Sequence, residues 1–291
     1  MSDRHVYRRT GASMTGRRFR PVRPIRRASA RLSVARAGAA LAMLASAGAI
    51  YGVGASPAFV YAHLRLDGAV YTDAAAAEAS ISSARGQNLF RLSTGPLRTE
   101  LEGLTTVANA SIGVQLPDTL QGTLTERVPV VVWKVGARRY LADADGNLFG
   151  RLGDKPPAQA ADVVVIDDRR AASAGLSVGL RLDPQDIDAA TRLASIVPAD
   201  VGSAAEALQV RVTDEYGFVI RADPQGWQAI FGFYTPSLRT TDLIPGQVRL
   251  LRSLLIGREP LIDRVILASD TDGTYVPKPT PRPSPSSSPA P

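Results

Sequence analysis

The residue types that carry out acid-base or metal chemistry are scarce in this chain. Histidine, the usual general acid or base near neutral pH, occurs only as His5 and His63. Cysteine is absent, which excludes a thiolate nucleophile, a thiolate metal site and a disulfide. The Ser-x-x-Lys pair and the glycine-rich phosphate loop are also missing from the sequence. We therefore predict no catalytic residue, no metal site, no cofactor and no small-molecule ligand.

Two acidic motifs are the remaining candidates for a metal site. The segment 143–147 contains the carboxylates of Asp143 and Asp145 and a glycine at its fourth position. A calcium loop needs more oxygen ligands and a glycine at its sixth position, so we predict a hairpin turn here. Asp167 and Asp168 follow a short apolar strand. Like charges at a strand end usually face solvent, and we interpret this pair as a solvated loop.

The positive charge of the chain is concentrated in the arm 1–36. This arm holds 11 of the 34 Lys and Arg residues and one acid, Asp3, for a net charge of +10; the rest of the chain has 23 basic and 26 acidic residues, a net charge of −3. The uncharged segment 37–62 follows. The positive-inside rule then places the arm in the cytoplasm, where anionic lipid head groups are sufficient partners. Because the arm has few aromatic residues and no groove-reading fold, nucleic-acid binding is not favoured.

Residues 37–58 are predicted to form a single transmembrane helix, because about 20 apolar residues cross the hydrocarbon core of a bilayer. The small residues Gly48, Gly52 and Ser56 recur at every fourth position, a spacing that lets a second membrane helix pack closely. A cleaved signal peptide is the alternative interpretation. In that case the mature protein would be a secreted soluble binding protein.

The segment 59–127 is expected to contain a strand, two helices and two further strands. A turn at Asp67-Gly68 ends the first strand, and Gly86 ends the first helix. Leucines at i, i+4 and i+7 predict a short second helix. Apolar residues then alternate with polar ones on both sides of Pro117-Asp118, which predicts an antiparallel hairpin.

This element order beside a membrane anchor resembles a POTRA domain, and short motifs extend the likeness. The motifs are Gly86-Gln87-Asn88-Leu89-Phe90, Val107-Ala108-Asn109-Ala110, Leu116-Pro117-Asp118-Thr119-Leu120 and Glu126-Arg127-Val128-Pro129. Together they resemble the cell-division FtsQ/DivIB family over residues 17–276. The resemblance implies a basic cytoplasmic arm, one membrane helix, a POTRA domain at 59–127 and a β domain at 128–276. A POTRA-containing translocase accessory protein is a rival, disfavoured because no series of barrel strands follows.

The segment 128–276 reads as an α+β fold with a mainly antiparallel sheet and flanking helices. A hairpin is expected around Gly136, one helix after Asp183-Pro184 and another around 247–256. The last strands are expected at 261–267 and 275–276. Beyond them, the segment 277–291 contains seven prolines, which predicts a disordered Pro/Ser-rich tail.

The function that the resemblance implies is non-catalytic. It implies a single-pass protein at the division septum, with a cytoplasmic N-terminus and an extracytoplasmic C-terminus. Its expected partners are small coiled-coil division proteins of the FtsB/FtsL or DivIC type and other components of the division machinery. An exposed sheet edge can accept a partner strand through unpaired backbone groups. The residues predicted for this edge are Leu261, Asp263, Val265, Leu267 and Tyr275.

Overall fold

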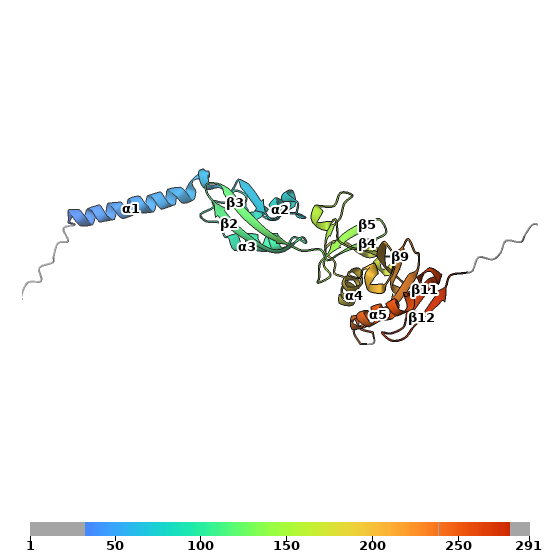
Figure 1. Ribbon diagram of the computed structural model, residues 1–291. Helices are drawn as coiled ribbons and strands as arrows, with labels where there is room; N and C mark the ends of the chain where they lie inside the picture. Colours follow the sequence, from blue (N-terminus) through green and yellow to red (C-terminus); the bar gives the residue numbers. More distant parts are fainter. Residues whose placement is uncertain (1–32, 238, 280–291) are drawn as a thin grey trace, which may run out of the picture. The chain divides into compact units, whose positions relative to one another are not determined.

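The computed structural model describes residues 33–237 and 239–279 (Figure 1). The described chain divides at residue 52, and the parts on either side are treated separately. Nearly all of the predicted basic arm, and the predicted tail from residue 280 onward, lie outside the described residues.

The first helix, α1, spans Val34–Ala55 and is long and apolar enough to cross a membrane. It begins and ends three residues earlier than the predicted helix 37–58. It ends at Ala55 because Ser56 and Pro57 start a 3-10 turn, Pro57–Phe59, in which Ser56 Oγ accepts a hydrogen bond from the backbone N–H of Ala58. Ser56 therefore lies outside the helix, which corrects its assignment to the helix-packing row. Gly48 and Gly52 lie inside α1, and their role in helix packing stays a prediction.

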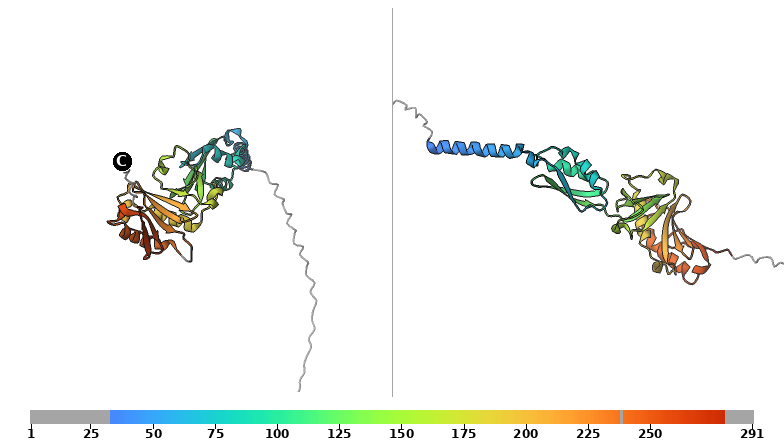
Figure 2. Two further views of the ribbon diagram at one scale, coloured as in Figure 1. Left: turned by 90° about the vertical axis from the view of Figure 1, so that its right-hand side faces the viewer. Right: turned by 90° about the horizontal axis from the view of Figure 1, so that it is seen from above.

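The next module has the element order β-α-α-β-β. Its strands form one sheet in the order β1-β3-β2, with β1 parallel to β3 and β2 antiparallel to β3. The elements are β1 (His63–Asp67), α2 (Ala74–Ser80), α3 (Thr94–Glu102), β2 (Val107–Gln115) and β3 (Thr119–Glu126), with a 3-10 turn at Ser82–Ala84. The helices lie on one side of the sheet (Figure 2), where Ile81, Leu101 and Leu120 are completely buried.

The second module is built on a nine-stranded sheet in the order β12-β11-β10-β9-β8-β7-β4-β5-β6. Its strands are β4 (Val131–Val135), β5 (Arg138–Ala142), β6 (Leu148–Arg151), β7 (Val165–Asp168), β8 (Ala207–Thr213), β9 (Gly217–Asp223), β10 (Gln228–Gly232), β11 (Ile262–Leu267) and β12 (Gly273–Pro277). Its helices are α4 (Pro184–Ala194) and α5 (Ile244–Leu255). Short 3-10 turns occupy Ala158–Ala160, Ala171–Gly175, Pro198–Val201, Thr241–Leu243 and Glu259–Leu261.

Five neighbouring strand pairs of this sheet are antiparallel and three are parallel. A parallel neighbour requires a long crossover, usually a helix. The helix α4 crosses from β7 to β8, and α5 crosses from β10 to β11. The predicted α+β fold with a mainly antiparallel sheet is confirmed.

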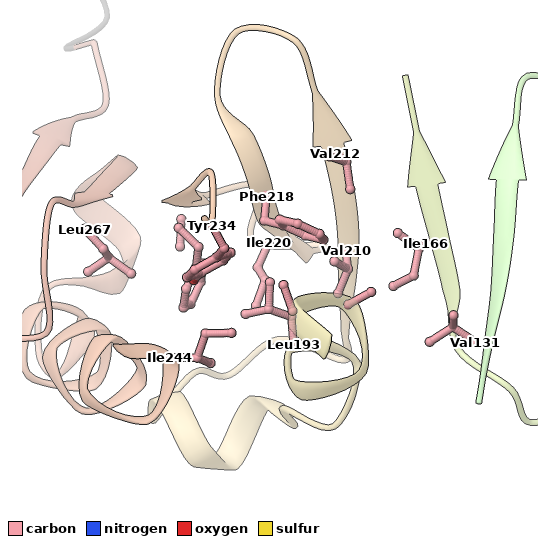
Figure 3. Packing of buried hydrophobic residues seen from close by; sticks show 14 of the residues in the cluster. Val131, Ile166, Leu193, Val210, Val212, Phe218, Ile220, Tyr234, Ile244 and Leu267 are labelled. Atoms are coloured by element: carbon pink, nitrogen blue, oxygen red, sulfur yellow. The ribbon is translucent and has the colours of Figure 1, made fainter. Parts of the chain in front are cut away.

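Both helices pack on the same face of the large sheet. Figure 3 shows Ile166, Val210 and Ile220 of the strands directed toward Leu193 of α4 and Ile244 of α5. The residues between them in sequence point to the opposite face, which carries Lys134, Asp167, Arg211 and other charged side chains. This alternation follows from the two-residue period of a strand.

Candidate partner-binding site

One edge of the large sheet is β12, the first strand in the order (Figure 1). Within the described residues, β12 pairs on one side only, with β11 in antiparallel register. The strand β11 pairs on both sides, because β10 lies parallel to it on the other side. The predicted edge segment 261–267 is therefore an inner strand, and the outermost strand runs through Tyr275.

The predicted edge residues separate into exposed and buried groups. Leu261 is 65% exposed and Tyr275 is 40% exposed, while Asp263 is half-buried. Val265 and Leu267 are buried in the hydrophobic core, so neither can offer its side chain to a partner. The cause is strand alternation: Val265 and Leu267 point toward α5, on the face that the helix covers.

One exposed edge residue was not in the predicted set. Val276 is 42% exposed and pairs with Arg264 of β11. Its apolar side chain next to Tyr275 gives the edge an apolar residue on each face of the sheet. The signal for it was present in the sequence, since Tyr275-Val276 was predicted as a strand.

The turn between β11 and β12 holds the edge in register. The hydroxyl of Ser269 accepts hydrogen bonds from the backbone N–H groups of Thr271 (3.2 Å) and Asp272 (2.9 Å). The N–H of Ser269 donates to the carbonyl of Asp272 at 3.0 Å. This short turn makes β12 a defined continuation of the sheet.

The inner strands beside the edge are held by two polar side chains that share acceptors. The amide Nε2 of Gln247, a buried residue of α5, donates to the carbonyls of Phe231 and Leu267, each at 3.2 Å. Arg239 donates to the same carbonyls, at 2.5 and 2.6 Å. The hydroxyl of Tyr234 donates to Gln247 Oε1 at 2.8 Å, and burial raises the pKa of this phenol. These bonds fix the ends of β10 and β11 against α5.

The start of β11 is anchored by a carboxylate. Glu259 accepts hydrogen bonds from the indole Nε1 of the buried Trp227 (2.8 Å), the backbone N–H of Ala204 (3.0 Å) and the hydroxyl of Ser203. Burial opposes ionisation of Glu259, but the bonds from Ser203, Ala204 and Trp227 outweigh it and lower its pKa. Glu259 thereby holds the turn that presents the exposed Leu261.

Chemically, this arrangement suits strand addition rather than bond-making. Its features are an ordered edge strand, flanking apolar side chains and a rigid support of buried hydrogen bonds. Across residues 33–237 and 239–279, no group of three or more histidine or acidic side chains is arranged to hold a metal ion.

The module that precedes the large sheet matches a known domain family. Residues 60–127 match the POTRA domain of the FtsQ type. The FtsQ/DivIB resemblance is confirmed. A cell division protein FtsQ from Mycobacteroides abscessus is 30% identical over 125 residues, which cover 43% of this chain and 39% of that protein.

Two further FtsQ/DivIB relatives match over a shorter length. They are the cell division proteins FtsQ of Chloroflexus aurantiacus and Chloroflexus aggregans, which are 32% and 33% identical over 98 residues. Each match covers 33% of this chain and 34% of the relative. The chain thus matches well under half the length of these relatives.

The Glu126-Arg127 motif has a structural role on both sides of the joint between the two modules. The carboxylate of Glu126 accepts hydrogen bonds from the backbone N–H groups of Val70 (2.9 Å), Tyr71 (2.8 Å) and Thr72 (2.7 Å). It therefore holds the loop that leads into α2. The next residue, Arg127, donates from Nη1 to Asp143 Oδ2 at 2.7 Å and from Nε to the carbonyl of Thr105 at 3.1 Å.

Asp143 in turn organises the predicted hairpin turn. Its Oδ1 accepts the backbone N–H groups of Asp145 (3.0 Å) and Asn147 (2.8 Å). Burial opposes ionisation of Asp143, but hydrogen bonds from Asn147 and Arg127 outweigh it and lower its pKa. The carboxylate is thus occupied by donors within the protein.

The interpretation of Asp167-Asp168 as a solvated loop is wrong. Both residues lie in β7, and the Asp168 side chain is fully buried. It accepts hydrogen bonds from Trp133 Nε1 (3.0 Å), Ser173 Oγ (2.5 Å) and three N–H groups of Arg170 (2.9 to 3.1 Å). The pair avoids repulsion because alternation along β7 sends the two carboxylates to opposite faces of the sheet.

Proposed function

We propose that this chain is a single-pass membrane protein of the bacterial division machinery that acts as a non-catalytic scaffold. The observation that carries the proposal is the free β12 edge in a chain whose preceding module is an FtsQ-type POTRA domain. The apolar helix α1 is consistent with one membrane anchor. The basic residues before it favour a cytoplasmic N-terminus, with both modules outside the cytoplasm and at the septum.

The partners that we propose are small coiled-coil membrane proteins of the FtsB/FtsL or DivIC type. A segment of such a partner would add a strand to β12, taking up backbone hydrogen bonds along the edge. Tyr275 and Val276 would contact alternate side chains of the added strand, and the exposed Leu261 would extend the apolar contact. Backbone pairing supplies affinity, while these side chains set the register.

A fluorescent fusion in dividing cells tests the cellular role. We expect enrichment at the septum, and we expect depletion of the chain to give filaments that grow without dividing. Uniform envelope fluorescence, together with normal division after depletion, would overturn the proposal.

N-terminal sequencing of the mature protein tests the anchor, because cleavage downstream of Ala47 would release a soluble protein.

Replacing Val276 with glutamate is expected to weaken partner binding by about tenfold, because the added strand would have to desolvate a carboxylate where it otherwise meets an apolar side chain, even with Arg264 opposite it in β11. Val276 is preferable to Val265 for this test, since a charge at the buried Val265 would unfold the domain. The measurement is a titration of the purified chain with the extracytoplasmic segment of its coiled-coil partner.

The matched control is Val165→Glu in β7. Val165 is also 42% exposed, but four strands separate β7 from β12 in the sheet. The control should bind its partner with unchanged affinity. Equal affinity of V276E and the unaltered chain, with both folded, would exclude β12 as the contact.

A further inference from the structure

The POTRA domain holds the chain directly where it leaves α1. The side chain of Asn88 donates to the backbone carbonyls of Val53 (3.3 Å) and Ser56 (3.1 Å). Its Oδ1 accepts the N–H of Phe90 at 3.0 Å, which shapes the loop that carries both residues. The backbone adds two bonds: Leu89 N–H donates to Phe59 O at 2.8 Å, and Tyr61 N–H donates to Gln87 O at 3.0 Å. No free linker therefore separates the last turn of the helix from this loop.

Helix length places this loop at the membrane surface. The 22 residues of α1 span about 33 Å at roughly 1.5 Å per residue, against about 30 Å of hydrocarbon. When α1 crosses the bilayer, Ala55 lies at the outer boundary of the hydrocarbon. The loop bound to Val53 and Ser56 must then lie among the lipid head groups.

Exposed apolar side chains gather at this end of the POTRA domain. Phe90 is 52% exposed, and its ring makes an edge-to-face contact with Phe59 at 5.0 Å between centroids. Leu116, which is 51% exposed, lies in the turn between β2 and β3. The pairing of His63 with Thr119 places this turn at the start of β1, a few residues after Phe59. Two elements distant in sequence thus contribute apolar groups to one end.

The loop at this end is positively charged, while Asp118, the acidic residue in the turn of Leu116, lies 4.0 Å from His63. The segment 85–96 contains Arg85 and Arg91 and no acidic residue. Arg85 pairs with Glu78 at 3.3 Å, whereas Arg91 forms no ion pair with the described part of the chain. The Arg91 side chain lies beside the helix exit, since a Cβ atom placed on Gly54 would be 3.4 Å from Arg91 Nε. A guanidinium here is available to lipid phosphate.

We propose that Phe59, Phe90, Leu116 and Arg91 form a membrane-contacting collar that binds the outer surface of an anionic bilayer. Aromatic rings are favoured at the head-group level, and arginine beside an anionic surface adds electrostatic attraction. The collar fixes this end of the POTRA domain on the bilayer instead of leaving it to swing on a tether. The inference rests on the proposed membrane anchor, and its partner is lipid, whereas the partner of β12 is protein.

The test uses tryptophan as a depth reporter in the full chain. Both native tryptophans, Trp133 and Trp227, are fully buried in the second module, so the unaltered chain provides the background. Phe90→Trp is reconstituted into vesicles of phosphatidylcholine and phosphatidylglycerol with brominated acyl chains. We expect the bromines to remove about half of the added emission, because interfacial rings lie at the acyl boundary. Leu116→Trp should give the same result from the second element.

Three further variants separate the possible outcomes. Tyr51→Trp, inside α1, must be quenched if the anchor spans the bilayer, and Val165→Trp, in the central strand β7, must not be. Arg91→Gln in the Phe90→Trp background should reduce quenching when phosphatidylglycerol is present and leave it unchanged in pure phosphatidylcholine.

Quenching at residue 51 without quenching at residues 90 and 116 would overturn the collar and leave the anchor intact. No quenching at residue 51 would overturn the anchor and the collar together. Shielding of the reporter at residue 90 only when another division protein is added would assign the surface to a protein and overturn the lipid proposal.

Discussion

Replacing Asp168 with alanine is expected to lower the free energy of unfolding by about 3 to 5 kcal/mol, because it leaves a largely buried guanidinium without its partner. The guanidinium is that of Arg170, whose side chain is 19% exposed and which also pairs with Asp186 at 2.7 Å. The indole of Trp133 and the hydroxyl of Ser173 would lose their acceptor as well. A buried donor left without an acceptor costs about 1 to 3 kcal/mol.

Chemical denaturation of a fragment covering residues 56–279 measures this loss. Asp168→Asn should also destabilise the fragment, since an amide has only one acceptor oxygen for donors that now bond to both oxygens. Asp154→Asn is the control, because the Asp154 side chain is fully exposed and surface charges contribute at most about 1 kcal/mol. Unfolding free energies of the Asp168 variants that match the control would show that the network does not stabilise the fold.

The contribution of Asp168 to the free energy of unfolding should decrease as the pH is lowered. Burial opposes ionisation of Asp168, but hydrogen bonds from Arg170 and Ser173 outweigh it and hold its pKa below the ordinary value. A carboxyl with a lowered pKa stabilises the fold above its unfolded pKa of about 3.9, and this stabilisation is lost as the pH falls through the folded pKa. The difference between the unaltered fragment and Asp168→Asn should therefore be largest at neutral pH and shrink below about pH 4.

Asp186 opposes this trend. Burial raises its pKa despite the attraction of Arg170, so its ionisation destabilises the fold and its protonation favours it at low pH. A raw stability profile would combine the two carboxyls. Because the charge of Asp168 is also the last of the causes that raise the pKa of Asp186, the difference between Asp168→Asn and the unaltered fragment reports Asp168 together with this smaller effect on Asp186.

The sequence predicted the elements whose signal is local. The alternation around Pro117-Asp118 predicted the β2-β3 hairpin, and Asp183 before Pro184 predicted the start of α4. The structure shows the reason for the latter, since the Asp183 side chain accepts the backbone N–H of Gln185 at 2.8 Å. Caps and hairpin turns are set by residues within a few positions of each other, so one sequence is enough to predict them.

The errors in prediction come from partners that are distant in sequence. Asp168 looked solvated because its acceptor role depends on Trp133, 35 residues earlier. Val265 and Leu267 were predicted to lie on an exposed edge strand. Alternation predicts that a strand has two faces, but it does not show which face a helix covers. It also does not show which later strand pairs beside it. The packing of α5 and the pairing of β12 decide both points. Neither can be derived from the period of the strand alone.

The Glu126-Arg127 motif could be recognised in the sequence, but its physical role could not. The motif contributed to the family resemblance, yet its physical role needs both modules. Glu126 closes the POTRA loop at residues 70–72, and Arg127 reaches Asp143 in the turn between β5 and β6 of the second module. Nearby, the hydroxyl of Thr105 donates to the carbonyl of Phe149 at 2.9 Å, and the rings of Tyr71 and Phe149 are 5.7 Å apart. These contacts join the two modules.

Arg127→Ala is expected to destabilise the 56–279 fragment by about 1.5 to 3 kcal/mol, the usual contribution of hydrogen bonds to charged groups. Asp143→Ala should cost about 3 kcal/mol, because it also leaves the turn N–H groups of Asp145 and Asn147 without their acceptor. If the two side chains act as a pair, the double variant should lose about 1 to 2 kcal/mol less than the sum of the single losses.

The same variants test whether the pair couples the modules in folding. Tryptophan fluorescence follows the second module alone, since Trp133 and Trp227 both lie there, while circular dichroism follows both modules. In the unaltered fragment the two transitions should coincide, as they do when one cooperative unit unfolds. In Arg127→Ala they should separate, because the POTRA domain then loses the charged contact that ties its last strand to the turn at Asp143. Strictly additive single losses with coincident transitions in every variant would mean that Arg127 and Asp143 are neighbours without energetic coupling, and that the apolar contact of Tyr71 with Phe149 joins the modules instead.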